Sequence, residues 1–451
     1  MPDAPPPPDA PVYDAIVVGA GLAGLCCART LCEAGKSVLL LEASDAVGGR
    51  IRTDRVDGFL LDRGFQVFNT AYEEARRWLD YDALGLRPFE PGALVQHGGR
   101  RHRLSDPWRR PGKALATAFS GAATLGDKLR IARLRSLLKR NRTLDAVAGE
   151  EVPTIDALRR YGFSDVIVER FFRPFLGGVF LEPELATSSR MFEFVFGLFG
   201  EGEVTLPAAG MQAIPEQIAA GLPDGVLVLG ARVGGLTRGR SNNAGEGPVG
   251  GTHDGGVFVD GVRRQAKFVV IATDGPAADA LLEEPSTAES WRSTTVVDFA
   301  ADTPPIDEGI LVLNGDGPDG AHGGPINTLS VPSRVQPTYA PGGQALVSAS
   351  LLGLPREGDD PTPEGDQTLT ESVRQHARAW FGAAVDAWRP LRVCRVRHAL
   401  PDQRPPHYQR IEKSLRARER VFVCGDRCDT ASINGAMRSG RRAAEAVLAA
   451  L

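Results

Sequence analysis

A glycine-rich segment at residues 19–24, GAGLAG, has the GxGxxG spacing that can bind a pyrophosphate. In such a segment the first glycine allows a tight turn, the second lets the backbone approach the phosphates, and the third permits close helix–strand packing. These positions are Gly19, Gly21 and Gly24 here. A following helix would offer free N–H groups to the phosphates, and Glu42 could accept hydrogen bonds from ribose hydroxyls. The segment predicts a dinucleotide site.

The elements that must position these residues occur in the required order. Residues 12–18, VYDAIVV, are apolar and rich in β-branched side chains, which indicates a buried strand. A helix is expected from Leu22 to Ala34, with Gly35 at its end. A second strand, Ser37 to Leu41, ends directly before Glu42. Because a GxGxxG alone is a weak signal, this strand–turn–helix–strand context decides against a simple glycine turn.

Two other segments have residue types that suit a phosphate or an anionic ring. The run GGR at residues 48–50 combines backbone that can approach closely with a permanent cation, Arg50. Near the other end, a strand at residues 420–423 leads to Gly425-Asp426, and a helix is expected from about Gly435 to Leu451. The N-terminus of such a helix stabilises negative charge that develops in front of it.

Several of these segments resemble a known superfamily. GAGLAGL, LEASDAVGGRIRT and LDRGFQVF are similar to the N-terminal part of flavin amine oxidases, phytoene desaturases and protoporphyrinogen oxidases, and SINGAMRSGRRAA at residues 432–444 resembles their C-terminal motif. The resemblance implies FAD rather than NAD. It also implies a noncovalent FAD, since Cys394 lies upstream of the position at which some members attach the flavin.

The resemblance further implies which residues contact the cofactor. Asp426 would bond ribityl or phosphate oxygens, and the helix near Gly435 would face the N1/O2 edge of the flavin. Val233 would meet the adenine through its backbone, and residues 64–67 would lie near the isoalloxazine. The expected contacts are Gly19, Ala20, Gly21, Ala23, Gly24, Glu42, Ala43, Gly48, Gly49, Arg50, Gly64, Phe65, Gln66, Val67, Val233, Ala272, Gly425, Asp426, Asn434, Gly435, Ala436 and Met437.

The pattern of strands and helices predicts an α/β fold. A two-dinucleotide-binding, Rossmann-like FAD domain would be interleaved with a mixed α+β substrate domain. The FAD domain is expected to comprise residues 12–75, 205–285 and 415–451, and the substrate domain residues 76–204 and 286–414. Residues 1–11, MPDAPPPPDAP, are expected to be a disordered tail, because they are rich in proline and lack the charged and apolar regions of a signal peptide.

The expected substrate domain is rich in phenylalanine between residues 171 and 199. Plain core packing explains most of these side chains, whereas an apolar tunnel to the flavin would suit an isoprenoid or a large flat ring. The run FFRPFLGGVFLEP resembles the desaturase and protoporphyrinogen-oxidase branches. The residues concerned are eight of the nineteen Phe, namely Phe171, Phe172, Phe175, Phe180, Phe192, Phe194, Phe196 and Phe199.

Three features bear on the reaction. No lysine lies between Phe268 and Glu412, where amine oxidases of this superfamily carry one near flavin N5, and Ser432 stands at the expected place of their cage tyrosine. No second GxGxxG follows a strand, which favours oxygen, a quinone or another carrier over a nicotinamide as electron acceptor. We therefore expect hydride removal from a large apolar substrate. The alternatives are an amine oxidase acting on a C–N bond and a flavin-binding protein without turnover. His398 and Arg397 are candidate catalytic residues, although a structural histidine is the simpler explanation of His398.

Composition limits the partners of the chain. With 451 residues, 42% of them hydrophobic and a net charge of −4, it does not resemble a nucleic-acid-binding protein. Its six cysteines form neither a disulfide framework nor a metal motif, so reduced thiols and a cytoplasmic location are expected, with no metal. Residues 125–142 predict a basic helix with its leucines roughly on one face. Such a helix is either packed on the core or laid on an anionic membrane surface.

Overall fold

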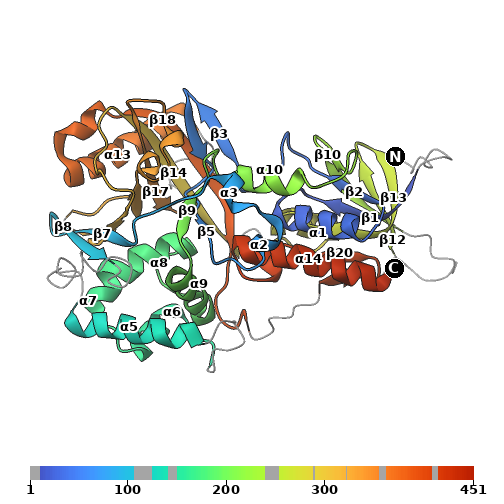
Figure 1. Ribbon diagram of the computed structural model, residues 1–451, viewed down its shortest axis with the longest axis horizontal. Coiled ribbons are helices and arrows are strands. Elements are labelled where there is room, and N and C mark those ends of the chain that lie inside the picture. Colours follow the sequence, from blue (N-terminus) through green and yellow to red (C-terminus); the bar gives the residue numbers. More distant parts are fainter. Residues whose placement is uncertain are drawn as a thin grey trace.

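The computed structural model describes residues 11–105, 124–140, 150–238, 253–287, 290–320, 322–354, 362–408 and 415–451. The predicted tail up to residue 10, residues 239–252 and residues 141–142 of the basic segment lie outside these ranges. Figure 1 shows two sheet-containing regions side by side, with a group of helices, α5 to α9, below one of them. None of the described helices is long and apolar enough to cross a membrane.

The first sheet has the strand order β10-β2-β1-β13-β12-β11, and β20 pairs with β13 on a side path that ends in β19. The pairs β10–β2, β2–β1, β1–β13 and β13–β20 are parallel, whereas β12 pairs with β13 and β11 with β12 antiparallel. Parallel strands covered on both faces require continuous apolar runs, which explains why residues 15–18 of β1 and all of β2 are buried. The bounds are β1 (Val12–Val18), β2 (Val38–Leu41), β10 (Leu227–Val228), β11 (Val233–Arg238), β12 (His253–Val259), β13 (Val262–Ile271), β19 (Arg416–Arg418) and β20 (Val421–Val423).

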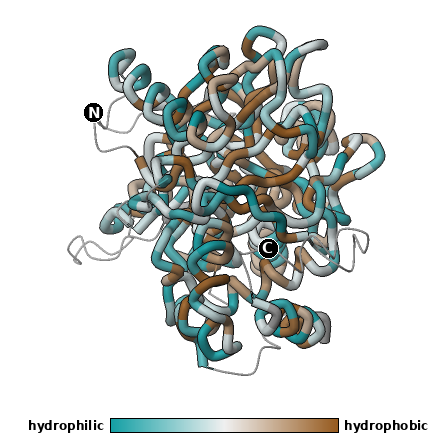
Figure 2. The backbone as a smooth tube through the Cα atoms, turned by 90° about the vertical axis from the view of Figure 1, so that its left-hand side faces the viewer, coloured by the Kyte–Doolittle hydropathy of each residue, from teal (hydrophilic) through white to brown (hydrophobic). Residues whose placement is uncertain are grey.

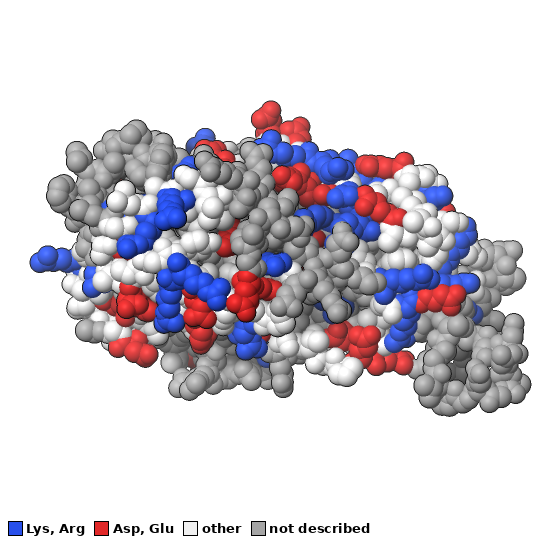
Figure 3. All heavy atoms as spheres, turned by 90° about the horizontal axis from the view of Figure 1, so that it is seen from below, with Lys and Arg blue, Asp and Glu red and all other residues white. Residues whose placement is uncertain are grey.

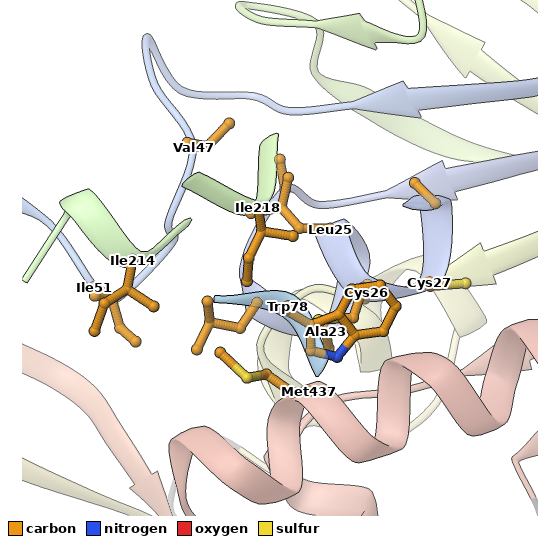
Figure 4. Close-up of a cluster of buried hydrophobic side chains, with 14 of the residues drawn as sticks. Ala23, Leu25, Cys26, Cys27, Val47, Ile51, Trp78, Ile214, Ile218 and Met437 are labelled. Carbon is orange, nitrogen blue, oxygen red and sulfur yellow. The ribbon is translucent and has the colours of Figure 1, made fainter. Parts of the chain in front are cut away.

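Helices from both ends of the chain cover one face of this sheet. The Cβ of any side chain placed at Gly440 would lie 2.0 Å from the carbonyl oxygen of Ala23, so only glycine permits this approach of α14 to α1. Figure 4 shows Ala23 and Cys26 of α1 together with Met437 of α14, Trp78 of α2 and Ile218 of α10 in one apolar cluster. The opposite face is covered by α11. The bounds are α1 (Leu22–Glu33), α2 (Ala75–Trp78), α10 (Ala213–Ala219), α11 (Gly275–Leu282) and α14 (Ile433–Ala450).

The second sheet has the order β18-β14-β17-β16-β15-β7-β8. One face packs on α13 through a separate core that includes Phe299, Val347, Val373 and Trp388. Figure 2, which colours the backbone by residue hydropathy, shows that hydrophobic residues concentrate in the interior. The bounds are β7 (Gly92–His97), β8 (Arg100–Ser105), β14 (Trp291–Ala301), β15 (Leu311–Asn314), β16 (Thr328–Ser330), β17 (Ala345–Leu352), β18 (Arg389–Pro401) and α13 (Pro363–Phe381), followed by η5 (Gly382–Ala387).

The helices below the second sheet form the phenylalanine-rich core. Phe172, Phe180 and Phe192 are buried there, and the other five of the eight are partly buried and packed against them. Most of these rings therefore hold helices together, as the packing interpretation expected. The bounds are α5 (Leu125–Arg140), α6 (Thr154–Arg160), α7 (Asp165–Ile167), η2 (Val168–Phe172), α8 (Arg173–Phe180) and α9 (Ser189–Glu201).

The leucines of α5 do not share one face, so that part of the sequence prediction was wrong. Leu134 and Leu138 are buried in the phenylalanine-rich core, whereas Leu129 is 74% exposed and Leu137 is 44% exposed. The arrangement follows from packing, because Leu134 and Leu138 belong to the core that α9 helps to form.

Short elements connect the two sheets. The segment LDRGFQVF begins at the end of β4, in the hairpin of β3 and β4, and runs to β5 in a three-stranded sheet of order β5-β9-β6. The bounds are β3 (Thr53–Val56), β4 (Phe59–Asp62), β5 (Phe68–Asn69), α3 (Tyr81–Leu84), β6 (Arg87–Pro88), β9 (Val204–Leu206), α12 (Pro332–Val335), η4 (Pro337–Tyr339) and η6 (Asp426–Cys428).

Most elements around the glycine motifs match the sequence prediction. The apolar run GVLVLGARV at residues 225–233 is typical of one strand by its sequence, but it does not form one. Only Leu227 and Val228 pair with β2, and β11 begins at Val233. Gly225 and Gly230 have positive φ values of 79° and 67°, so turns interrupt the apolar run on both sides of β10.

Candidate functional site

The glycine turn between β1 and α1 is shaped for an anion. A Cβ at Gly24 would lie 1.8 Å from the carbonyl oxygen of Gly19, whereas a Cβ at Gly21 would have no atom within 4 Å. The helix begins at Leu22 without a side-chain cap and without an acidic residue in its first turn. Its unpaired N–H groups therefore face open space, and a phosphate can approach them at Gly21.

The second glycine motif lies directly against the first. Gly21 and Gly48 form a parallel bridge, and the amide of Gly48 donates to the carbonyl oxygen of Ala20 over 2.9 Å. A Cβ at Gly49 would lie 3.5 Å from the Cα of Gly21. The two motifs thus form one continuous backbone surface, as a shared pyrophosphate site requires.

Glu42 lies at the end of β2, as expected, but it already has protein partners. Its carboxylate accepts hydrogen bonds from the amide of Ala20 over 2.7 Å and from the amide and hydroxyl of Ser44 over 2.9 and 2.8 Å. A carboxylate can accept about four such bonds, so one acceptor position is left for a ribose hydroxyl. Glu42 therefore also stabilises the glycine turn itself.

Arg50 and Asp426 are paired with each other. The guanidinium donates to both carboxylate oxygens over 2.9 and 2.7 Å, and to the carbonyl oxygen of Ala399 over 2.7 Å. The guanidinium also lies 5.4 Å from the centre of the Trp291 ring. Burial lowers the pKa of Arg50, but the Asp426 carboxylate outweighs burial and the net direction is upward. This pair joins the GGR turn to the end of β20.

The C-terminal helix begins at Ile433, two residues earlier than predicted. Its N-cap is Ser432, whose hydroxyl accepts from the amide of Gly435 over 3.0 Å and pairs with the hydroxyl of Thr430 over 2.8 Å. The Asn434 side chain accepts from the amide of Glu74 over 3.0 Å. This helix N-terminus lies at the end of β20, where the resemblance places the flavin edge.

The remaining predicted contacts are distributed around this site. The Gln66 side chain donates to the carbonyl oxygen of Arg50 over 2.8 Å, which ties the loop after β4 to the GGR turn. Ala272 follows β13 and its amide donates to Val18. Ala23 and Met437 are buried in the core between α1 and α14, where Figure 4 shows them, so their side chains pack rather than face open space. Ala43, Gly64, Phe65, Val67, Val233, Gly425 and Ala436 lie in the turns, loops and element ends around this site.

The candidate catalytic residues are on β18 but do not border the cavity described below. His398 lies 3.5 Å from a carboxylate oxygen of Asp274 and edge-on to Trp291, the ring that also contacts Arg50. Arg397 is exposed. His398 therefore lies near Arg50, because both side chains contact Trp291.

A small cavity lies between the loop after β4 and the second sheet. Its volume is about 20 Å³, which is enough for a water molecule. It is not the large apolar cavity that the tunnel interpretation of the phenylalanine-rich segment required, and none of those eight Phe lines it. The lining residues are Leu60, Asp62, Gly64, Phe65, Gln66, Leu206, Val296, Asp298, Pro332, Tyr339, Leu346 and Ser348.

Two acids of this cavity were missed by the sequence analysis. Burial raises the pKa of Asp62 to about 6, and it also raises the pKa of Asp298. The available signal was an acid inside an apolar strand run, FLLD for Asp62 and TTVVDFAA for Asp298. Their proximity could not be seen in the sequence, because it depends on how the β3–β4 hairpin meets the second sheet.

The glycine turn, the GGR turn and the N-terminus of α14 together fit FAD. The open space at Gly21 admits a pyrophosphate, and Glu42 retains an acceptor position for ribose. The family profile described as "Flavin containing amine oxidoreductase" matches residues 22–448. That match includes the segments on which the fit rests, except Gly19, Ala20 and Gly21.

Individual relatives span different parts of the chain. Coproporphyrinogen III oxidase of Mycobacterium tuberculosis (strain ATCC 25618 / H37Rv) is 27% identical and covers 96% of this chain and 97% of its own. Several other relatives align over a third or less of their own length. Coproporphyrinogen III oxidase of Propionibacterium freudenreichii is 32% identical over 39% of this chain and 33% of its own. Putrescine oxidase of Kocuria rosea is 46% identical over 17% of this chain and 16% of its own.

Solved structures share the fold. A putative protoporphyrinogen oxidase from Exiguobacterium has a TM-score of 0.70 at 19% identity, and 97% of this chain and 99% of that chain are covered. Wild-type putrescine oxidase bound to putrescine has a TM-score of 0.68 at 17% identity with the same coverage. At these identities the likeness concerns the fold alone.

Proposed function

This chain belongs to the flavin-containing amine oxidoreductase family, and we propose that its substrate is a reduced tetrapyrrole of the coproporphyrinogen type. It is an FAD-dependent oxidoreductase. The observation that carries the substrate proposal is the alignment with a coproporphyrinogen III oxidase over 96% of this chain and 97% of that protein. The sequence match to putrescine oxidase, in contrast, covers 17% of the chain.

Residues of the chain argue against an amine substrate. No lysine lies between Phe268 and Glu412, and the residue of β14 that lines the cavity beside Asp298 is the apolar Val296. Ser432 stands at the expected place of a cage tyrosine. Its hydroxyl caps α14, and a serine has no π face that could bind a cation. These departures support the tetrapyrrole over an amine.

FAD would supply a two-electron acceptor for hydrogen removed from the substrate. The chain supplies the positions: Gly21 and the N-terminus of α1 for the pyrophosphate, and the N-terminus of α14 for negative charge on the flavin. Oxygen or a quinone is the proposed final acceptor, since the sequence has no second GxGxxG after a strand.

The substrate proposal is tested by mixing the FAD-loaded protein anaerobically with coproporphyrinogen III and, separately, with putrescine and a simple alkyl amine. We expect the porphyrinogen to bleach the flavin absorbance and the amines to leave it unchanged. Bleaching by an amine, or by neither class, would overturn the proposal. Readmitting oxygen and measuring hydrogen peroxide then tests the acceptor.

We also propose that α5 touches an anionic membrane surface. Its exposed side carries Leu129, Leu137 and, between them, the exposed Arg133. Figure 3, which views this side of the molecule, shows basic groups near α5 among acidic ones. Apolar side chains beside cations are the combination that an anionic lipid surface binds.

Vesicle sedimentation tests this contact. We expect the protein to sediment with vesicles containing phosphatidylserine but not with pure phosphatidylcholine. The double variant Leu129→Ser/Leu137→Ser should lose most of this binding, whereas Leu227→Ser, on an edge strand far from α5, should not. Equal sedimentation of wild type and the α5 double variant would refute the contact.

A further inference from the structure

The water-sized cavity lies between the loop expected beside the flavin and two acids, the half-buried Asp62 and the buried Asp298. Gly64, Phe65 and Gln66 form one side, and Asp62 precedes them at the end of β4. The opposite side is the face of the second sheet that points away from α13. The cavity therefore lies between the loop after β4 and this face of the second sheet.

That face of the sheet carries a polar row across four strands. Ser330 pairs with Ser348, Ser348 with Asp298, and Asp298 with Arg392, so all four side chains share the face. The Asp298 carboxylate accepts from the Ser348 hydroxyl over 2.6 Å and from Arg392 over 3.0 Å. Ser330 is 1% exposed, and its hydroxyl has no hydrogen-bond partner among the described residues. A row of this kind is polar enough to hold water in the cavity.

Asp62 has only neutral partners within the described part of the chain. Its carboxylate accepts from the hydroxyl of Thr53 over 2.5 Å, the amide of Met211 over 3.0 Å and the hydroxyl of Tyr339 over 2.8 Å. Arg392 donates to the backbone carbonyl of Asp62 over 2.6 Å, but its two carboxylate partners are Asp54 and Asp298. The side chain of Asp62 therefore has no ion pair to keep it charged.

The charged groups around Asp62 act in opposite directions. Asp298, on β14, opposes ionisation of Asp62, while Arg392, on β18, is already shared by two other carboxylates. Asp54, on β3, is held ionised because Arg63 and Arg392 lower its pKa. Tyr339 is a neutral donor, since burial raises its pKa well above the ordinary value. Asp62 is thus a carboxyl whose charge a new charge nearby can change.

We propose that Asp62 is a redox-linked proton site, which takes up one proton when the bound flavin is reduced and releases it when the flavin is reoxidised. Reduction of FAD to its anionic form consumes two electrons and one proton. The carboxylate of Asp62 then accepts a second proton from solvent and becomes neutral. The electrons come from the oxidised substrate or from an electrode. The proposal requires bound FAD but no particular substrate.

The coupling follows from Coulomb's law. Reduction adds one negative charge to the flavin, which disfavours a second negative charge at Asp62. At an effective dielectric constant of about 20, a unit charge roughly 10 Å away raises a carboxyl pKa by about one unit. Burial already raises the pKa of Asp62 to about 6, so a further rise reaches the neutral range.

The test is the pH dependence of the flavin midpoint potential, measured by spectroelectrochemistry. Each proton coupled to a two-electron couple changes the potential by about 30 mV per pH unit. With a pKa of about 6 before reduction and a rise of about one unit, Asp62 takes up about half a proton on average near pH 6.5. We therefore expect a maximal slope of about 45 mV per pH unit for the wild type near this pH, and about 30 mV for Asp62→Asn. Asp54→Asn is the matched control, because it alters a carboxyl of the same hairpin that is ionised throughout. It should keep the wild-type slope.

Identical slopes for wild type and Asp62→Asn would overturn the proposal. A second variant guards against a folding defect: Tyr339→Phe removes one donor to Asp62, so the pH at which the slope changes should move upward. In the wild type, the reduced-minus-oxidised infrared difference spectrum should show the carbonyl stretch of a newly protonated carboxyl, and its absence would equally refute the assignment. A protein that shows this signal but is not reduced by coproporphyrinogen III would contradict only the substrate proposal.

Discussion

Two glycines of the GxGxxG turn should respond to substitution in opposite ways. Gly21 has φ −70° and ψ 177°, which any residue adopts, and a Cβ there meets no protein atom within 4 Å. Gly21→Val should therefore leave the free energy of unfolding of the FAD-free protein within about 1 kcal/mol of wild type. Its methyl groups would instead occupy the space that the pyrophosphate needs.

The loss of FAD affinity can be estimated from the contacts removed. Hydrogen bonds to a charged group contribute about 1.5–3 kcal/mol each, so losing two at the helix N-terminus costs about 3–6 kcal/mol. That corresponds to at least a hundredfold rise in Kd. Gly24→Ala is the contrasting variant, because its Cβ would lie 1.8 Å from the carbonyl oxygen of Gly19. It should destabilise the FAD-free protein by about 1–3 kcal/mol or more.

Two measurements separate these effects. FAD titration, followed by quenching of flavin fluorescence, gives Kd, and urea unfolding with and without FAD gives stability. At FAD concentrations about 100 times the wild-type Kd, wild type should gain about 2.7 kcal/mol on adding FAD, and Gly21→Val should gain almost nothing. Wild-type FAD affinity in Gly21→Val would refute our placement of the pyrophosphate. Wild-type stability of Gly24→Ala would refute the close packing.

Three further outcomes are expected. Glu42→Ala should weaken FAD binding by about 1–3 kcal/mol, and it should also lower the stability of the FAD-free protein, because Glu42 accepts hydrogen bonds from Ala20 and Ser44. Glu42→Gln should retain more of the FAD affinity and more of the stability. Unchanged FAD titration and urea unfolding curves would contradict this expectation. Acid precipitation should leave a colourless pellet, since the pKa of the Cys394 thiol is raised by burial and the thiol is a poor nucleophile; a yellow pellet would show a covalent flavin. The pKa of Asp62 in the folded state, about 6, exceeds the ordinary value of 3.8. Asp62 therefore stabilises the folded state at low pH, and this stabilisation is lost as the pH rises through about 6. The lost stabilisation amounts to roughly 3 kcal/mol. Urea unfolding at several pH values should therefore show a smaller decline for Asp62→Asn than for wild type, and parallel curves would argue against the raised pKa.

Local sequence was sufficient for the elements that hold the dinucleotide. Val12–Val18, the GAGLAG turn, α1 and β2 are contiguous, and their structure depends on apolar periodicity and on glycine conformations that neighbouring residues set. The strand before Gly425 and the C-terminal helix were predictable for the same reason. The error in the start of α14 was two residues, because the cap hydroxyl of Ser432 bonds to Gly435 and so begins the helix earlier.

Tertiary structure alone decided which of these segments meet. The bridge between Gly21 and Gly48, the Arg50–Asp426 pair and the contact of the β3–β4 hairpin with the second sheet join residues far apart in sequence. The split of the α5 leucines between core and surface depends on how α5 packs against α9. Likewise, an acid inside an apolar strand, such as Asp298, is visible in the sequence, but its environment is not. Sheet register and helix docking set the dielectric surroundings and charge partners of a side chain, and these surroundings determine whether a carboxyl such as Asp62 can change its charge.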